Sequence, residues 1–175
     1  ITLTAEYVSC APEGFQLNIA PSGIRISCGD GAGFFYALGV LVQLAAQAGG
    51  TLPCAEIADE PVLSVRGIML DIGRDKIPAM ETLRRLIDLF ASMRINHLQM
   101  YMEGFSFDYE DFHYLFTNET PMTPAEFREL SLYARAHFID LVPNQNVLGH
   151  MEKWLEKPQF RSLAECEDGY IFENL

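Results

Sequence analysis

Residues 66–74, RGIMLDIGR, decide the fold of this chain, because residues 67–72 are a nearly continuous apolar run. Such a run is typical of a strand that is covered on both faces, as in a parallel sheet. Two further strands are predicted at residues 97–102 and 139–143. Helical spacing of apolar residues separates the three, from Pro78 to about Met93 and from Thr123, which begins a capping box, to about His137.

This alternation of strands and helices with short links predicts parallel strands joined by right-handed crossovers. The long polar and aromatic segments, 103–121 and 144 onward, follow the carboxyl ends of strands, whereas the helix-to-strand links are tight. In parallel α/β folds the carboxyl ends of the strands build the active site. We therefore expect functional side chains at that edge.

A small α/β domain is predicted ahead of these strands, in residues 1–61. Alternating apolar residues in 15–19 and 24–28 flank a Pro-Ser-Gly turn and indicate a hairpin. Asp30 is the expected N-cap of a helix from Gly31 to about Ala48, and residues 51–61 are expected to be a connector. The second domain is then residues 62–175.

The composition excludes several classes of partner. The formal net charge is −12, with 24 acidic and 12 basic residues, so neither nucleic acid nor an anionic membrane surface is expected to bind. No apolar run reaches the ~18 residues of a membrane span. A neutral small molecule such as a sugar is compatible with this charge.

Four cysteines are expected to be buried free thiols, which favours a reducing compartment such as the cytoplasm. They stand at positions 10, 28, 54 and 166 and form no C-x-x-C pair. The first residues contain no signal peptide and no initiator Met, which indicates a processed or cut chain whose upstream signal, if any, would not be seen.

Arg74 and Glu103 follow the first two predicted parallel strands. Arg74 could form a loop ion pair with Asp71, or its fixed fork of donors could hold two adjacent hydroxyls. The loop after Glu103 alternates aromatic and acidic residues, a pattern that suits sugar binding, because rings stack on a pyranose and carboxylates accept from hydroxyls. For most of these aromatics taken individually, anchoring of a long loop is the preferred interpretation.

Neutral polar groups follow the third strand, namely Asn144, Gln145, Asn146 and His150. They supply hydrogen-bonding amides and one imidazole that could carry a proton. No metal-ligand spacing such as H-E-x-x-H is present, and the Gly-rich segment at 29–33 fits neither a dinucleotide fingerprint nor a P-loop. We therefore expect no metal and no cofactor.

These segments resemble glycoside hydrolase family 20, the β-N-acetylhexosaminidases. Residues 66–74 resemble the first barrel strand of that family, roughly R-G-x-x-L-D-x-x-R, and residues 143–150 resemble its third-strand motif, which ends in Pro-Gly-His. Residues 24–38 and 52–54 are similar to the end of its small leading domain. The resemblance implies the first three β/α units of an incomplete (β/α)8 barrel.

The resemblance also implies roles for particular residues. Arg74 matches the arginine that holds hydroxyls of the terminal sugar, and His150 matches the supporting active-site histidine. By their place at the strand ends, where they depart from the family pattern, Tyr101, Asn144 and Asn146 are expected to bind substrate, with Glu103 as a further catalytic candidate. This chain has Gln99 and Tyr101 where the family usually has His-x-His, which indicates a divergent member.

The function implied by the resemblance is retaining, exo-acting cleavage of terminal N-acetylhexosamine, assisted by the substrate's own acetamido group. The family's catalytic Asp-Glu pair ends a fourth strand, and a full barrel takes about 250 residues, so five more units do not fit after Pro143. We expect this chain alone to be inactive.

Two rival interpretations remain at this stage: a non-catalytic carbohydrate-binding or scaffold protein, and an independent three-strand module of the flavodoxin-like type. Three barrel strands cannot close, so we also expect the chain to self-associate through its uncovered edges and inner face.

Overall fold

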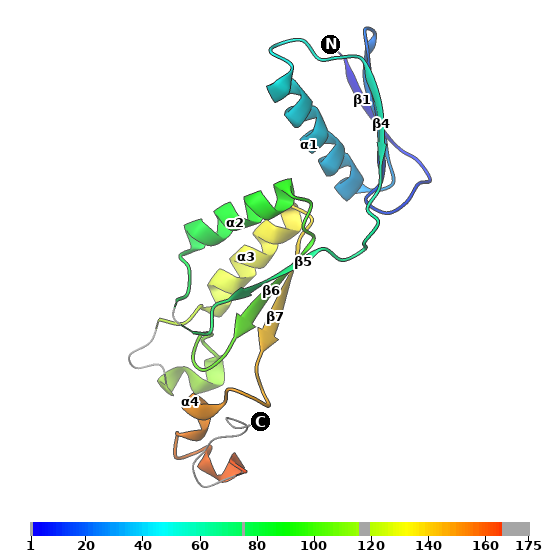
Figure 1. Cartoon of the computed structure of the whole chain (residues 1–175). Coiled ribbons are helices and arrows are strands. Elements are labelled where there is room, and N and C mark those ends of the chain that lie inside the picture. Colours follow the sequence, from blue (N-terminus) through cyan, green and yellow to red (C-terminus); the bar gives the residue numbers. More distant parts are fainter. Residues whose placement is uncertain (1, 75, 116–119, 166–175) are drawn as a thin grey trace. The chain divides into compact units, whose positions relative to one another are not determined.

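A computed structural model describes residues 2–74, 76–115 and 120–165. The chain divides into two compact units, Ile1–Ser64 and Val65–Leu175. Each unit has its own sheet (Figure 1).

The first unit is a four-stranded mixed sheet with one helix, in the order β1-β3-β2-β4. Strand β1 runs parallel to β3, and β2 pairs antiparallel with both β3 and β4. The predicted hairpin and helix are confirmed. Two strands were missed: β1, which was not predicted, and β4, which lies in the segment expected to be a connector. The elements are β1 (Leu3–Tyr7), β2 (Phe15–Ala20), β3 (Gly23–Cys28), α1 (Gly31–Gln47) and β4 (Ala55–Asp59).

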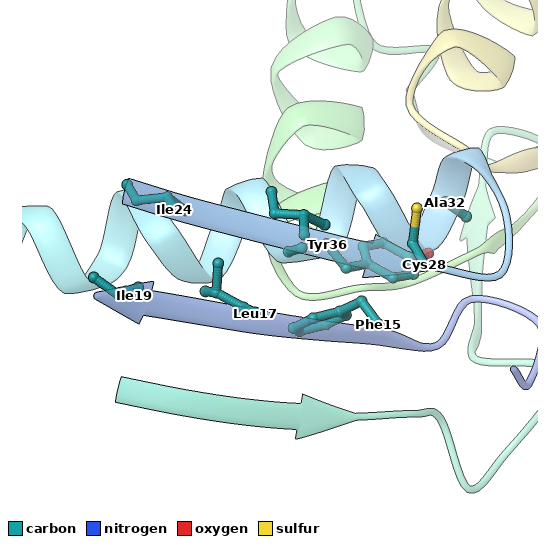
Figure 2. Packing of buried hydrophobic residues seen from close by; sticks show 9 residues of the cluster. Phe15, Leu17, Ile19, Ile24, Cys28, Ala32 and Tyr36 are labelled. Carbon is teal, nitrogen blue, oxygen red and sulfur yellow. The ribbon is translucent and has the colours of Figure 1, made fainter. Parts of the chain in front are cut away.

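Helix α1 covers one face of this sheet (Figure 2). Alternate residues of β2, Phe15, Leu17 and Ile19, are buried beneath it, as a period of two residues requires. Asp30 caps α1 as predicted, since its side chain accepts from the backbone N–H of Gly33 at 2.8 Å. Gly33 has no room for a Cβ against the backbone of Gly14, the residue before β2, so the helix begins in close contact with the segment that leads into the sheet.

The cysteine prediction is confirmed for one residue and wrong for two. Cys28 is buried under α1, whereas Cys10 and Cys54 are exposed, and all three are free thiols. Cys10 and Cys54 lie outside the alternating positions that α1 covers, which is why they stay exposed. Burial, with Cys10 and Asp30 nearby, raises the pKa of the Cys28 thiol. Cys166 lies outside the described residues.

The second unit is a parallel three-stranded sheet in the order β5-β6-β7, with α2 and α3 side by side along one face (Figure 1). This confirms the predicted α/β arrangement. Between and after the main elements lie two 3₁₀ helices, η1 and η2, and a short helix, α4, which were not predicted. The elements are β5 (Gly67–Asp71), α2 (Met80–Ser92), β6 (His97–Met102), η1 (Glu110–Leu115), α3 (Pro124–Ala136), β7 (Asp140–Gln145), α4 (Glu152–Leu155) and η2 (Arg161–Leu163).

The two faces of this sheet differ. Leu98, Met100 and Met102 alternate along β6 on one face and are buried, as are Ile87 of α2 and Leu130 of α3. On the other face Met69 of β5 remains 59% exposed. The expectation that β5 is covered on both faces is therefore wrong for the described part of the chain, in which no helix packs on the second face.

The helix ends determine where the short and the long connections of this unit lie. The predicted capping box is confirmed, because the Thr123 side chain accepts from the N–H of Glu126 and the Glu126 carboxylate accepts from the N–H of Thr123. Helix α2 begins at Met80 rather than Pro78, since Ala79 is extended and forms the N-cap. Arg94 and Phe138, each with φ near +60°, turn the chain tightly from helix to strand. The long loops therefore leave from the opposite, carboxyl ends of the strands.

Candidate functional site

The carboxyl ends of β5, β6 and β7 lie side by side, in a register that pairs Asp71 with Tyr101 and Tyr101 with Asn144. Glu103 follows β6 directly, and Arg74 lies three residues after the end of β5. The parallel register therefore brings residues from three distant parts of the sequence to one edge, as the alternation of strands and helices predicts.

Glu103 is the centre of this cluster. One carboxylate oxygen, Oε1, lies 3.6 Å from Nε of Arg74, and the other, Oε2, accepts a hydrogen bond of 2.8 Å from the Tyr101 hydroxyl. Nδ1 of His150 lies 3.9 Å from the same Oε2. The Glu103 side chain is only 16% exposed, whereas Arg74 and His150 are 58% and 57% exposed. A shielded carboxylate thus holds two accessible side chains.

Arg74 forms the ion pair with Asp71 that its spacing allows, at 3.4 Å, and also faces Glu103 and the ring of Tyr101. Its guanidinium carbon lies 5.6 Å from the ring centroid. Asp71, followed by Tyr101 and Glu103, raises the pKa of the Arg74 guanidinium, which therefore stays charged. More than half of the side chain faces solvent, so a ligand can reach it.

Gly73 allows this close arrangement. A Cβ at Gly73 would lie 2.6 Å from the backbone nitrogen of Glu103, a distance that side chains do not adopt. The Gly73 N–H donates a hydrogen bond of 2.9 Å to Oδ1 of Asp71, which orients that carboxylate toward Arg74. The glycine therefore positions both carboxylates that hold the arginine.

Tyr101 links the first two strands to the third. Its hydroxyl donates to Glu103 and accepts from Nδ2 of Asn146, whose backbone N–H is itself bound to the carbonyl of Met102 at 3.0 Å. Burial, together with the hydrogen bond to Glu103, raises the pKa of the Tyr101 hydroxyl. The phenol therefore remains a neutral donor at ordinary pH.

Asn144 lies apart from the cluster around Glu103. Its Nδ2 donates a hydrogen bond of 3.1 Å to the side-chain oxygen of Gln99 and lies 3.7 Å from the sulfur of Met69. Asn144 therefore contacts the uncovered face of the sheet. Of the six predicted site residues, five form this cluster, Glu103 included, and Asn144 is not among them.

His150 has an unusual backbone. Its φ is +53°, in the left-handed region that costs a non-glycine residue about 1 kcal/mol or more. In this conformation the imidazole lies beside Glu103, with Nδ1 3.9 Å from the carboxylate. An outlier of this kind beside a polar cluster supports a functional role for the side chain.

The aromatic residues after Glu103 mainly anchor their loop. Phe105 and Trp154 are both 7% exposed, and their rings meet edge to face with centroids 5.0 Å apart. The Trp154 indole N–H donates a hydrogen bond of 2.8 Å to the carbonyl of Gly104. Tyr109 and Phe112 pack on the same indole. Sequence reasoning missed Trp154, although it is the one tryptophan of the chain and follows a candidate histidine closely.

Two further properties of the described residues bear on ligands. Within residues 2–74, 76–115 and 120–165, no group of three His, Cys, Asp or Glu side chains could hold a metal ion. In the same ranges no helix combines the length and the apolar character needed to cross a membrane.

Two family descriptions match consecutive parts of the chain. Residues 1–60 match "Glycosyl hydrolase family 20, domain 2", and residues 64–170 match "Glycosyl hydrolase family 20, catalytic domain". The second match alone covers more than half of the chain.

Curated relatives include a β-hexosaminidase of Akkermansia muciniphila, 28% identical over 158 residues, which cover 79% of this chain and 32% of the relative. A lacto-N-biosidase of Bifidobacterium bifidum is 28% identical over 87% of this chain and 14% of its own length. The chain thus spans a third or less of these relatives.

Solved structures share the fold. A β-N-acetylhexosaminidase of Bacteroides fragilis superposes with a TM-score of 0.82 at 24% identity, over 99% of this chain and 38% of that one. An exo β-N-acetylglucosaminidase of Vibrio harveyi, solved in complex with N-acetylglucosamine, superposes with a TM-score of 0.78 at 21% identity, over 88% of this chain and 28% of that one.

Proposed function

Because the chain belongs to glycosyl hydrolase family 20, we propose that the protein it forms part of removes terminal N-acetylhexosamine from glycans. In this proposal the reaction is exo-acting, retains the anomeric configuration and needs no cofactor. The curated relatives named β-hexosaminidase and the Vibrio harveyi complex with N-acetylglucosamine support this class of substrate. The observation that carries the proposal is the cluster around Glu103.

The cluster suits a neutral sugar. Arg74 offers a charged fork of donors to two adjacent hydroxyls, and Glu103 offers acceptors to hydroxyl protons. Tyr101 and Asn146 are neutral groups that can exchange hydrogen bonds with a further hydroxyl. Asn144 would contact a sugar that extends over the uncovered face of the sheet. His150, held beside Glu103, is proposed to support proton movement.

We assign bond cleavage itself to residues beyond these three strands. In the substrate-assisted route a Glu protonates the leaving oxygen while an Asp orients the acetamido group, whose carbonyl attacks the anomeric carbon. That pair is expected at the end of a fourth strand, and the described residues of the barrel-like unit contain β5, β6 and β7. The 175 residues alone are therefore proposed to orient substrate without turning it over.

Release of 4-nitrophenol from 4-nitrophenyl N-acetyl-β-glucosaminide tests the proposal. The longest natural protein that contains these residues should be active and the 175-residue chain inactive. Arg74→Gln should lower kcat/KM about tenfold to a hundredfold, the effect of losing one or two charge-assisted hydrogen bonds. Arg85→Gln is the matched control, because Arg85 is 77% exposed on α2 and pairs with Glu81.

Two outcomes would contradict the proposal. Turnover by the 175-residue chain at the rate of the longer protein would place the acid within these residues. Saturable binding of N-acetylglucosamine to a longer protein that never hydrolyses the aryl glycoside would instead favour a carbohydrate-binding protein of the same fold.

A further inference from the structure

A small pocket adjoins the cluster around Glu103 and shares Arg74 with it. It has a volume of about 150 Å³ and is enclosed by the segment after β5, the segment after β6 and helix α4. Arg74, Lys76, Ser106, Thr120 and Lys153 supply its polar side chains. The described part of its lining contains no carboxylate. Lys76 and Lys153 thus add two positive charges to the lining beside that of Arg74.

The pocket contains a polar group that lacks a partner. Ser106 is 5% exposed, and its hydroxyl makes no hydrogen bond among the described residues. Buried hydroxyls are normally paired, and an unpaired one calls for a bound water, ion or ligand. The hydroxyl oxygen has almost no accessible surface, so a ligand with acceptor oxygens in this pocket would supply that partner once the Ser106 side chain turns toward it.

The lysines of the chain gather around the same pocket. The chain has three lysines and a net charge of −12, yet Lys76 and Lys153 both line the pocket. The third, Lys157, places its ammonium 5.2 Å from the ring centroid of Phe105, another lining residue. A local concentration of positive charge in an acidic chain attracts anions.

The two lining lysines are the charges available to a ligand. Arg74 is balanced by Asp71 and Glu103, at 3.4 and 3.6 Å. Lys76 and Lys153 form no ion pair within the described residues. The stem of Lys153 packs over Gly104, whose added Cβ would lie 2.7 Å from Cδ of the lysine.

We propose that this pocket binds a tetrahedral oxyanion, a sulfate or phosphate group, through Lys76, Lys153 and the Ser106 hydroxyl. Three acceptor oxygens of such a group match two ammonium donors and one hydroxyl donor. Because Arg74 borders both the pocket and the cluster around Glu103, an ester of this kind on a glycan could be held next to the bound sugar. The proposal concerns binding and does not depend on hydrolysis.

Calorimetric titration of inorganic sulfate and phosphate into the 175-residue chain, at low chloride, tests the site. Saturable binding is expected, and Lys153→Gln should weaken it at least about tenfold, as loss of a charge-assisted hydrogen bond does. Ser106→Ala should weaken it in the same direction. Lys157→Gln is the matched control and should bind within about twofold of the unchanged chain, since Lys157 does not line the pocket.

Circular dichroism of each variant separates loss of the site from loss of the fold. Absence of saturable binding in the folded chain would overturn the proposal, and so would equal losses in the Lys153 and Lys157 variants. Comparison of N-acetylglucosamine 6-sulfate with inorganic sulfate then identifies the source of the group. Tighter binding of the sulfated sugar supports a glycan ester, and tighter binding of the inorganic ion supports a free anion in the same site.

Discussion

Tyr101 and Glu103, two residues apart where β6 ends, are joined by a hydrogen bond of 2.8 Å from the phenol to the carboxylate. The bond fixes the shielded Glu103 carboxylate, and through it the positions of Arg74 and His150. It also keeps the phenol protonated, because burial and the adjacent carboxylate both raise the pKa of Tyr101.

The raised pKa of Tyr101 predicts a loss of stability in alkali. A tyrosine whose pKa is higher in the folded state than the unfolded value of 10.0 contributes stability below pH 10, and this contribution is lost as the pH rises through the folded-state pKa. Tyr101→Phe should therefore flatten the alkaline fall in the free energy of unfolding, measured by denaturant titration at stepped pH. An unchanged slope would show that Tyr101 titrates normally.

Gly73→Ala should disturb the cluster without changing any charge. The new Cβ would lie 2.5 Å from Cγ and 2.6 Å from the backbone nitrogen of Glu103, so the backbone must move. We expect a loss of about 1–3 kcal/mol in the free energy of unfolding. Gly149→Ala is the control, because nothing lies within 4 Å of its added Cβ. Equal losses of stability in both variants would contradict the claim that Gly73 is required by its close approach to Glu103.

The proposed boundary between residues 61 and 62 predicts where a protease cuts first. Val62 is 97% exposed and Leu63 is 66% exposed, between two units with separate sheets. Brief digestion followed by mass spectrometry should yield two fragments that meet within residues 60–66. First cuts inside β5 or α2 would place the boundary elsewhere.

Self-association is expected of the 175-residue chain. Among the described strands of the second unit, β5 and β7 each pair on one side only, and Met69 is 59% exposed on the uncovered face. Sedimentation velocity should show a mass that rises with concentration, and Met69→Lys should reduce the effect by placing a charge on that face. A compact monomer at all concentrations would contradict this expectation.

The sequence predicted the elements whose signals are local. The apolar run at 67–72, the capping box at Thr123 and the cap at Asp30 each depend on neighbouring residues, and the structure contains the corresponding elements. Strands β1 and β4 were missed, because each belongs to the sheet only through pairing with a distant strand. Coverage of β5 was overestimated, because an apolar run alone does not show whether other elements cover both faces of a strand.

The candidate site was predictable as an edge of the sheet but not as a set of contacts. The parallel order implied that Arg74, Glu103 and Asn146 would meet where the strands end. No pattern indicated that Glu103 would be the shared partner, or that Asn144 would contact Gln99 instead. Those outcomes depend on side-chain direction and on the close approach at Gly73.

A crystal structure of the longest natural protein containing this chain, with N-acetylglucosamine bound, tests the central claim most directly. Two adjacent hydroxyls of the sugar should lie within hydrogen-bond distance, about 2.7–3.2 Å, of the Arg74 guanidinium, with Glu103 still holding that side chain. A sugar bound away from the carboxyl ends of β5 and β6, with Arg74 in contact with Asp71 and Glu103 alone, would contradict it.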